Sequence, residues 1–298
     1  MIAFTRVHGG LLNRMWRLDT DNGSFAVKQL TADRGWTYRF DDVFRFERAA
    51  FAASIPMPEP IAANETMLVH RWVEGDKVPH EPVSPALAHE IGMILARVHG
   101  LDVPWSHVSI EDPMPTEDEW RALAERAVDQ PWAPELSAAV PAFGAIGRFV
   151  DAAGRPEPIV LTHKDLSQKN LLVRDGRPIV LDWEVTGKMP VSMELGSTAL
   201  RLAAGDLLDS LRPAVFQAVL DGYVDAGGVL PAPGAHWFAD HLGGWTWFTR
   251  WNIERCVTGV EPSSGPSLAL SHETVRAALH GLPAALAGLD RLADLTAR

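Results

Sequence analysis

The chain has little cysteine and no long apolar segment. Cys256 is its single cysteine, so an internal disulfide and a zinc site built from several cysteines are excluded. No uncharged run approaches the length of about 20 residues that crosses a bilayer. The N-terminal stretch MIAFTRVHGG has no apolar core long enough for a secretion signal. We therefore expect a cytoplasmic protein without a membrane partner.

Positive charge is also in deficit. With 27 basic and 38 acidic residues the net charge is −11, which argues against nucleic acid as a partner. The acidity is compatible with a cationic small molecule, although it also simply aids solubility. At 298 residues, 47% hydrophobic and 22% charged, the chain can bury a large core in one large or two modest domains. Composition sets no oligomeric state.

One stretch, LTHKDLSQKNLLVRDGRPIVLDWE from Leu161 to Glu184, concentrates the chemical groups. An apolar run leads into a polar loop, and two β-type segments follow around an Asp175-Gly176 turn. The apolar run is 158–161, and the two β-type segments are 171–173 and 179–181. This pattern predicts a strand, a loop and a hairpin. It places the polar residues of the loop and those after the second hairpin strand close together at the open end of the hairpin.

The polar residues of this stretch suit phosphoryl transfer, which needs positioning and charge neutralisation more than covalent help. Asp165 can orient an acceptor hydroxyl and take its proton. Asn170 and Asp182 can supply the hard oxygen ligands that Mg²⁺ prefers, and His163 can brace the loop. A lone His-x-Asp is common and an Asp opening a turn is often a solvated cap, but here several residue types match in order.

The N-terminal part reads as three strands over 2–7, 15–18 and 25–28. Gly9 and Gly10, between the first two, would let backbone N–H groups approach phosphates closely. A Gly-Gly pair alone is weak evidence, because turns use it routinely. Lys28, at the end of an Ala-Val-Lys segment, stands where a kinase-type fold places its phosphate-binding lysine.

Helical periodicity over 38–53 carries Glu47, which we expect to pair with the strand lysine, with Asp42 as the alternative partner. The apolar run 67–73 reads as a strand entering an inter-lobe hinge. His70 and Trp72 lie on it, and free backbone groups there would meet the adenine of a nucleotide. The other interpretation of Trp72 is core packing.

The rest of the chain reads as mostly helical. Ser84 and Pro85 are typical of a helix start, and an apolar stripe runs from there to Gly100. Further helices are expected over 117–128, 135–153, 193–204, 207–226, 236–256 and 273–295, the last divided near 281–283 by a Gly-Leu-Pro segment. We predict an α+β fold with a β-rich nucleotide-binding lobe over 1–75 and a mostly helical lobe over 76–298, which carries the catalytic loop and the substrate-binding region.

The strand lysine, the 87–100 helix, HKDLSQKN and DWE together resemble the aminoglycoside phosphotransferase-like family of the protein-kinase-like superfamily. The resemblance implies a two-lobed fold and transfer of the γ-phosphate of ATP or GTP, with Mg²⁺, to a hydroxyl of a small molecule. It implies that Asp165 is the catalytic base, that Asn170 and Asp182 are metal ligands and that Lys28 anchors phosphates. Glu194 replaces the Asp that usually braces the catalytic loop.

The acceptor is less defined. Aminoglycoside-type antibiotics are the leading class, and Asp240, Glu254 and Glu261 could recognise their amines, although each reads equally well as a solvated charge. Lys164 and Lys169, where the family has small residues, add positive charge and weaken the case for a polycation. The tryptophans of 237–251 could wall an acceptor pocket, but their spacing favours the core.

Other functions stay open. Choline, a sugar, an amino alcohol or another natural product could be the acceptor. A non-catalytic nucleotide-binding pseudokinase is disfavoured because the expected polar positions are filled. A protein kinase is disfavoured by Asp-Trp-Glu and by the lack of an Ala-Pro-Glu segment.

Overall fold

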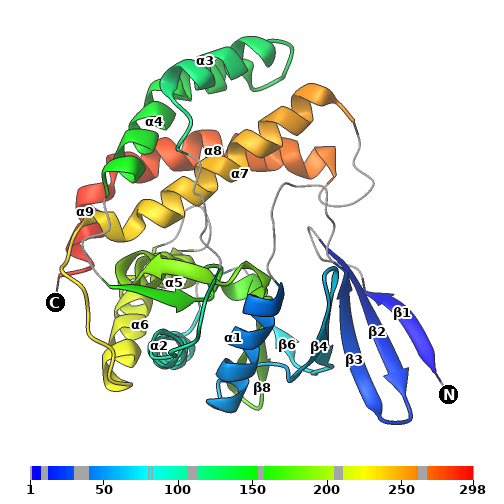
Figure 1. Cartoon of the computed structure of the whole chain (residues 1–298). Helices are drawn as coiled ribbons and strands as arrows, with labels where there is room; N and C mark the ends of the chain where they lie inside the picture. The colour runs from blue at the N-terminus through cyan, green and yellow to red at the C-terminus, as the bar shows by residue number, and fades with distance from the viewer. Residues whose placement is uncertain are drawn as a thin grey trace.

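The computed structural model has a small antiparallel sheet beside a larger helical part (Figure 1). The residues that it describes are 2–7, 13–29, 40–79, 81, 83–106, 113–153, 158–204, 211–260 and 267–297. The predicted two-lobed α+β fold is confirmed. The exact boundary after residue 75 stays a prediction.

The N-terminal sheet has five strands in the order β1-β2-β3-β5-β4, all antiparallel. The three strands expected before residue 30 are confirmed, and β4 is one that the sequence pattern did not predict. The strands are β1 (Ala3–Val7), β2 (Arg14–Thr20), β3 (Gly23–Gln29), β4 (Pro60–Ala63) and β5 (Met67–Arg71). Gly23 has φ +114°, as the tight β2–β3 turn requires.

Helix α1 (Phe40–Ala52) follows β3 in the chain and lies between the sheet and the helical part (Figure 1). Its Phe46 side chain is fully buried, and the ring centroid lies 6.0 Å from that of Trp183 beside the polar loop.

On the sheet, Lys28 pairs with Leu68 and Ala26 with His70. Because side chains of paired residues, and of residues two apart, share a face, Lys28 and His70 project from the same face.

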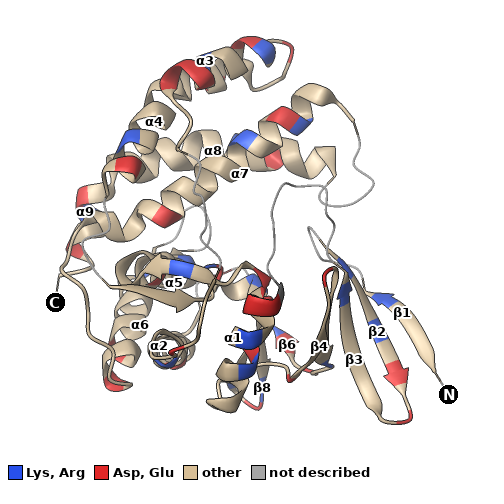
Figure 2. Ribbon diagram, viewed as in Figure 1, with Lys and Arg blue, Asp and Glu red and all other residues tan. Residues whose placement is uncertain are grey.

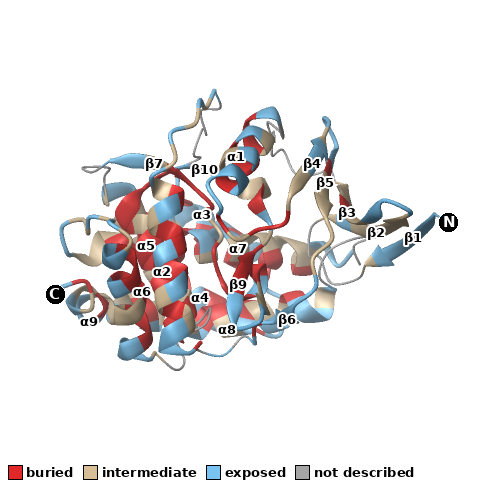
Figure 3. Cartoon of the chain, turned by 90° about the horizontal axis from the view of Figure 1, so that it is seen from below, coloured by how far each residue is buried: buried red, intermediate tan, exposed pale blue. Residues whose placement is uncertain are grey.

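The helical part has two apolar clusters. One lies mainly among α2, α5 and α6, whose facing sides are buried in Figure 3. The second lies among α3, α4, α7 and α8. The helices are α2 (Pro85–His99), α3 (Glu117–Arg126), α4 (Ala133–Ala152), α5 (Val191–Ala204), α6 (Pro213–Asp225), α7 (Ala239–Thr258), α8 (Leu268–Ala287) and α9 (Leu289–Asp294).

The segment with the chemical groups follows the predicted order. It comprises β7 (Ile159–Thr162), the short helix η1 (Gln168–Asn170), β8 (Leu171–Arg174), β9 (Arg177–Val180), η2 (Trp183–Val185) and β10 (Gly187–Pro190). Asp175 and Gly176 have φ +53° and +75°, as a tight hairpin turn requires. β8 pairs with β9 and with β6 (Asp76–Lys77), while β7 pairs with β10.

The start of α2 confirms the expected cap, because the Ser84 hydroxyl accepts the Leu87 N–H at 3.2 Å.

The expected division of the last long helix near Pro283 is wrong. Helix α8 continues through Pro283 to Ala287, and Gly288 separates it from α9. Proline kinks a helix without ending it when packing holds both sides, and Leu282 and Ala285 are buried. None of the helices in the described ranges has the length and apolar character of a membrane span.

Gly92→Ala should destabilise the fold, because α2 and α6 approach closely at this glycine. A Cβ on Gly92 would lie 2.0 Å from the Val219 carbonyl oxygen, so backbone must move. We expect a loss of about 3 kcal/mol in the free energy of unfolding, measured by urea denaturation. The control is Gly244→Ala on α7, which meets no atom within 4 Å and should stabilise the helix by about 0.5–1 kcal/mol. Equal stabilities of the two variants would contradict the packing argument.

Candidate active site

His163 holds the polar loop to the hairpin. The side chain is buried, its Nδ1 accepts the Asp165 N–H at 3.2 Å, and its Nε2 donates to the Leu181 carbonyl at 2.7 Å. Burial lowers the pKa of His163, although the carbonyl bond and the charge of Asp165 oppose that shift. A neutral ring fits both bonds, since Nδ1 must accept. Because Leu181 directly precedes Asp182, these two bonds hold the loop that carries Asp165 close to Asp182.

Asp165 is bonded on both carboxylate oxygens. The Asn170 amide donates to Oδ2 at 3.0 Å and to the Asp165 carbonyl at 2.7 Å. Lys169 Nζ lies 3.0 Å from Oδ2, and Arg201 Nη1 lies 3.2 Å from Oδ1. The sequence pattern did not assign Arg201 a role. It lies seven positions after Glu194 on α5, which places both on one helix face.

Lys28 crosses from β3 to the other lobe. Its Nζ lies 2.7 Å from Asp182 Oδ1 and 2.7 Å from Glu184 Oε1. The Asn13 amide also donates to Glu184 Oε1, at 3.0 Å. Asp182 has φ +60°, a left-handed conformation that Asp tolerates better than most residues. Glu184 and Asn13 are participants that sequence reasoning missed, and the Asp-x-Glu spacing of DWE was the available signal for Glu184.

Burial and charge compete at this cluster. Burial is the largest single influence on Asp182 and opposes its ionisation, but the charge and hydrogen bond of Lys28, with the charge of Lys169 acting in the same direction, lower the pKa of Asp182. At Glu184 burial is the larger influence and raises the pKa, against the attraction of Lys28. Burial alone would lower the pKa of Lys28, but the two carboxylates together raise it above its ordinary value. The ammonium therefore stays charged.

The expected pairing of Lys28 with Glu47 is wrong. The Glu47 Oε1 atom lies 3.0 Å from His70 Nε2 instead, and Lys28 binds the two acids of the other lobe. The sheet register explains the difference, because His70 lies opposite Ala26, two residues before Lys28 on the same face. Asp42, the alternative partner, bonds to Arg45 at 2.7 Å and to the Ser106 hydroxyl at 2.7 Å.

The hinge residues make contacts inside the first lobe. The Trp72 backbone N–H donates to the Ser24 carbonyl at 2.9 Å, so it is not a free donor for an adenine. The Trp72 indole donates to Glu74, and the Arg17 guanidinium lies 4.9 Å from its ring centroid. A nucleotide-binding role for His70 and Trp72 stays a prediction.

Gly9, Gly10 and Glu261 lie outside the described residues. The other two acids proposed for amine recognition differ in position. Asp240, in the first turn of α7, lies near enough to Asp165 and Arg201 for their charges to affect its pKa, which burial raises. Glu254 instead pairs with Arg250 at 3.2 Å within α7.

Glu194 is buried beside the polar loop that carries Asp165. Its Oε1 accepts the Lys164 N–H at 3.1 Å, next to Asp165. Burial is the largest influence on its pKa, with the charge of Asp240 second, and together they raise it to about 8. Lys164 has φ +66°, a strained conformation for a non-glycine residue, and the bond to Glu194 holds it there.

The tryptophans of 237–251 separate into two groups. Trp237 is fully buried, as the core interpretation predicts, whereas Trp247 is 37% exposed. Phe248 and Trp251 stack on the same helix.

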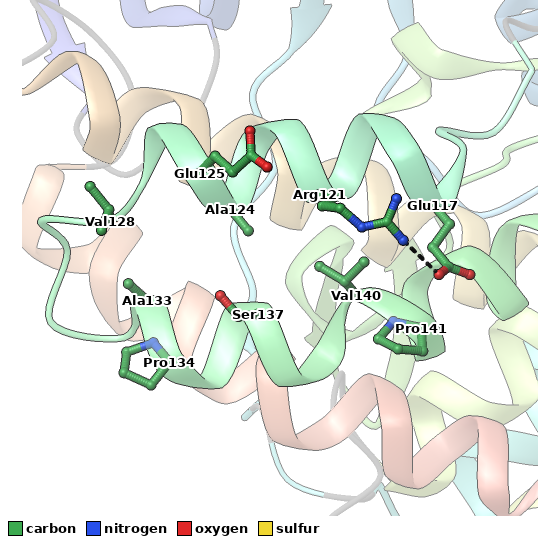
Figure 4. A pocket seen from close by; sticks show the side chains of 10 residues that line it. All are labelled: Glu117, Arg121, Ala124, Glu125, Val128, Ala133, Pro134, Ser137, Val140 and Pro141. Carbon is green, nitrogen blue, oxygen red and sulfur yellow. Dashed lines mark hydrogen bonds and ion pairs between the residues drawn. The ribbon is translucent and has the colours of Figure 1, made fainter.

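A separate open hollow of about 660 Å³ lies between α3 and α4, lined by side chains such as Glu117, Arg121 and Ser137 (Figure 4). These residues belong to neither the Asp165 nor the Lys28 cluster.

The donor set around Asp182 fits magnesium. Leu181 N–H donates to the Asn170 carbonyl at 2.9 Å, which holds Asn170 next to the strand that ends before Asp182. With its NH₂ group committed to Asp165, Asn170 has its amide oxygen for a metal. Across the described ranges, no three His, Cys, Asp or Glu side chains gather as a metal-binding group. Mg²⁺ commonly uses one or two carboxylates plus water and phosphate oxygens, so this smaller set suffices.

The fold is that of a kinase-like phosphotransferase. The chain belongs to the phosphotransferase enzyme family (APH), whose model matches residues 3–232. No curated protein sequence matches it. The resemblance expected from the sequence motifs is thus confirmed.

Solved structures share the fold at low sequence identity. Spectinomycin phosphotransferase in complex with ADP and spectinomycin is 12% identical, with 97% of this chain and 93% of that chain covered and a TM-score of 0.71. Choline kinase from Streptococcus pneumoniae is 14% identical, with coverages of 95% and 93% and a TM-score of 0.63. Macrolide 2′-phosphotransferase from Brachybacterium faecium is 18% identical, with coverages of 93% and 91% and a TM-score of 0.52. At these identities the likeness establishes the fold alone.

Glu194→Gln should flatten the pH dependence of stability. The pKa of Glu194 is about 8 in the folded protein, against an ordinary value of 4.5. Its stabilising contribution is therefore fully present below the ordinary value and is lost as pH rises toward 8, on the order of a few kcal/mol. Urea denaturation between about pH 5 and pH 8 measures this. Glu125→Gln, on the exposed face of α3, is the control. An unchanged slope in Glu194→Gln would contradict the assignment.

Proposed function

We propose that the protein transfers the γ-phosphate of ATP or GTP to a hydroxyl of a small molecule. The observation that carries the proposal is the contact of Lys28, from the sheet, with Asp182. The residue before Asp182 is hydrogen-bonded to His163 in the loop of Asp165. Two lobes thereby contribute to one site, as transfer between a nucleotide and an acceptor requires. Membership of the phosphotransferase family supports it.

Asp165 acts on the acceptor. A carboxylate oxygen of Asp165 accepts the hydroxyl proton while the hydroxyl oxygen bonds to the γ-phosphorus. The bond from that phosphorus to the β–γ bridging oxygen breaks, and the nucleoside diphosphate leaves. Asn170 and Arg201 hold the carboxylate in place through Oδ2 and Oδ1. Preorganisation of this kind lowers the cost of orienting the hydroxyl.

The nucleotide side is built from Lys28, Asp182, Glu184 and Asn170. Lys28 would bind phosphate oxygens, and Asn170 and Asp182 would hold Mg²⁺, with Glu184 available beside them. When bound, Mg²⁺ neutralises charge that develops on the phosphates. Gly9 and Gly10 are proposed to approach the phosphates, and His70 and Trp72 to lie beside the nucleotide base.

The acceptor classes proposed are aminoglycoside-type antibiotics and, as the alternative, choline, a sugar, an amino alcohol or another natural product. The solved phosphotransferases with this fold include proteins named for spectinomycin, macrolides and choline, so the fold serves chemically different acceptors. Asp240 lies near enough to Asp165 for the two charges to interact, and it is the acid that we propose for recognition of an amine on such an acceptor. A cytoplasmic location is proposed from the sequence.

A non-catalytic nucleotide-binding protein is the second candidate. Asp165, Asn170, Asp182 and Lys28 are all present and bonded to one another in pairs, which favours catalysis. Tight ATP binding without transfer to any acceptor of a broad panel would favour the second candidate instead.

Asp165→Asn should abolish turnover and leave nucleotide binding intact, because the amide cannot accept the hydroxyl proton. We expect kcat to fall by about 10²–10⁴-fold, measured by coupled release of nucleoside diphosphate, with nucleotide affinity followed by calorimetry. Asp118→Asn, at a position with an 89% exposed side chain, is the control with the same change of charge. Near-normal kcat in Asp165→Asn would remove Asp165 as the base.

Asp182→Asn should weaken the use of magnesium. Losing one anionic oxygen ligand should raise the Mg²⁺ concentration for half-maximal rate by about tenfold or more, and chelation of Mg²⁺ should stop the wild-type reaction. The measurement is a Mg²⁺ titration at saturating nucleotide. A wild-type rate unaffected by chelator would contradict the metal assignment.

A further inference from the structure

Positive charge collects around Asp165 from the catalytic loop and from helix α5. Lys169 lies on one carboxylate oxygen and Arg201 on the other, at 3.0 and 3.2 Å. Lys164, the preceding residue, is close enough for its charge to act on Glu194 and Asp240. Lys28 binds Asp182 and Glu184 instead. The cations at Asp165 are therefore additional to the phosphate-binding lysine and lie where the acceptor must approach.

The nearby acids only partly cancel this charge. Glu194 is 1% exposed, and its pKa of about 8 leaves it largely protonated at neutral pH. Burial also raises the pKa of Asp240. In the chain as a whole acids outnumber bases, and both signs are spread over the helices in Figure 2. The acceptor side of the site thus departs from the acidic balance of the rest of the protein.

Lys169 is the cation best placed to exchange partners. Its side chain is 44% exposed, whereas that of Arg201 is 12% exposed. The Arg201 backbone carbonyl also accepts the Gln168 amide at 2.7 Å, which ties α5 to the loop. An exposed lysine–carboxylate pair is weak and easily replaced. A carboxylate has about four acceptor positions, and Lys169 occupies one that an incoming hydroxyl could take.

We propose that the acceptor is an alcohol with an acidic group, a carboxylate or a phosphate, near the reacting hydroxyl, and that Lys169 binds this group. The inference rests on the proposed phosphotransfer and narrows its acceptor classes to an acidic sugar or another acidic natural product, in place of the polycationic aminoglycosides. As the hydroxyl takes its place on Asp165, the Lys169 ammonium moves from Asp165 to the acidic group, so no charge loses its partner. A polycationic acceptor would instead bring amines against Lys164, Lys169 and Arg201, where like charges repel.

The test uses acceptors that differ only in charge. Glycerate, glycerol and 3-aminopropane-1,2-diol form one matched set, gluconate, glucose and glucosamine a second, and kanamycin represents the aminoglycosides. Transfer is followed by release of nucleoside diphosphate and by phosphorus NMR of the product. We expect the acidic members to be preferred by about tenfold or more in kcat/KM.

Variants of Lys169 test whether this side chain causes the preference for acidic acceptors. Lys169→Gln should raise KM for the acidic acceptor by about tenfold while leaving KM for ATP unchanged, and Lys169→Arg should retain most of the preference. Arg126→Gln, which removes a positive charge from the exposed end of α3, should change nothing.

Three results would overturn the inference. Preference for the neutral or amine members would reject the acidic acceptor and leave the phosphotransferase proposal standing. A fall in kcat for every acceptor alike in Lys169→Gln, without a change in acceptor KM, would assign Lys169 to the transferred phosphoryl group. Transfer to no acceptor of this set or of a broad panel that includes choline, with ATP tightly bound, would reject both proposals.

Discussion

The contact of the Lys28 ammonium with Asp182 and Glu184 is the interaction on which the site depends, because it joins residues 154 and 156 positions apart. The sheet supplies the cation and the polar hairpin region supplies the acids. The Lys28 and Glu184 side chains are only 12% and 10% exposed, and a mostly buried charge without a counterion is costly. The relative placement of the lobes and the charge state of the cluster therefore support each other, and α1 reinforces the junction through Phe46 and Trp183.

The polar loop that carries Asp165 depends on a second set of hydrogen bonds, made by buried side chains. His163 fixes the loop to the strand before Asp182, and Glu194 fixes it to α5 through the Lys164 N–H. Asp165 is held between them by Asn170 and Arg201. A short polar segment with few apolar side chains would otherwise sample many conformations. Its order comes from the helices and strands that carry its partners.

Local chemistry made much of this predictable. The Ser84 cap and the Asp175-Gly176 turn are each encoded in adjacent residues, so the sequence indicates them reliably. Pairings between distant elements are different. Glu47 bonds to His70 and not to Lys28 because of the β3–β5 register, and Arg201 reaches Asp165 because α5 packs beside the loop. Helix periodicity cannot specify either arrangement, and it also missed that buried neighbours carry α8 past Pro283.

The left-handed backbone of Lys164 couples the stability of the polar loop to the charge of the site. Lys164 has φ +66°, a conformation that costs a non-glycine residue about 1–3 kcal/mol and that glycine adopts freely. A glycine here would relieve that strain, and it would also remove the positive charge that acts on Glu194 and Asp240. A substitution chosen only to make the loop more heat-tolerant would therefore also change the electrostatics beside Asp165.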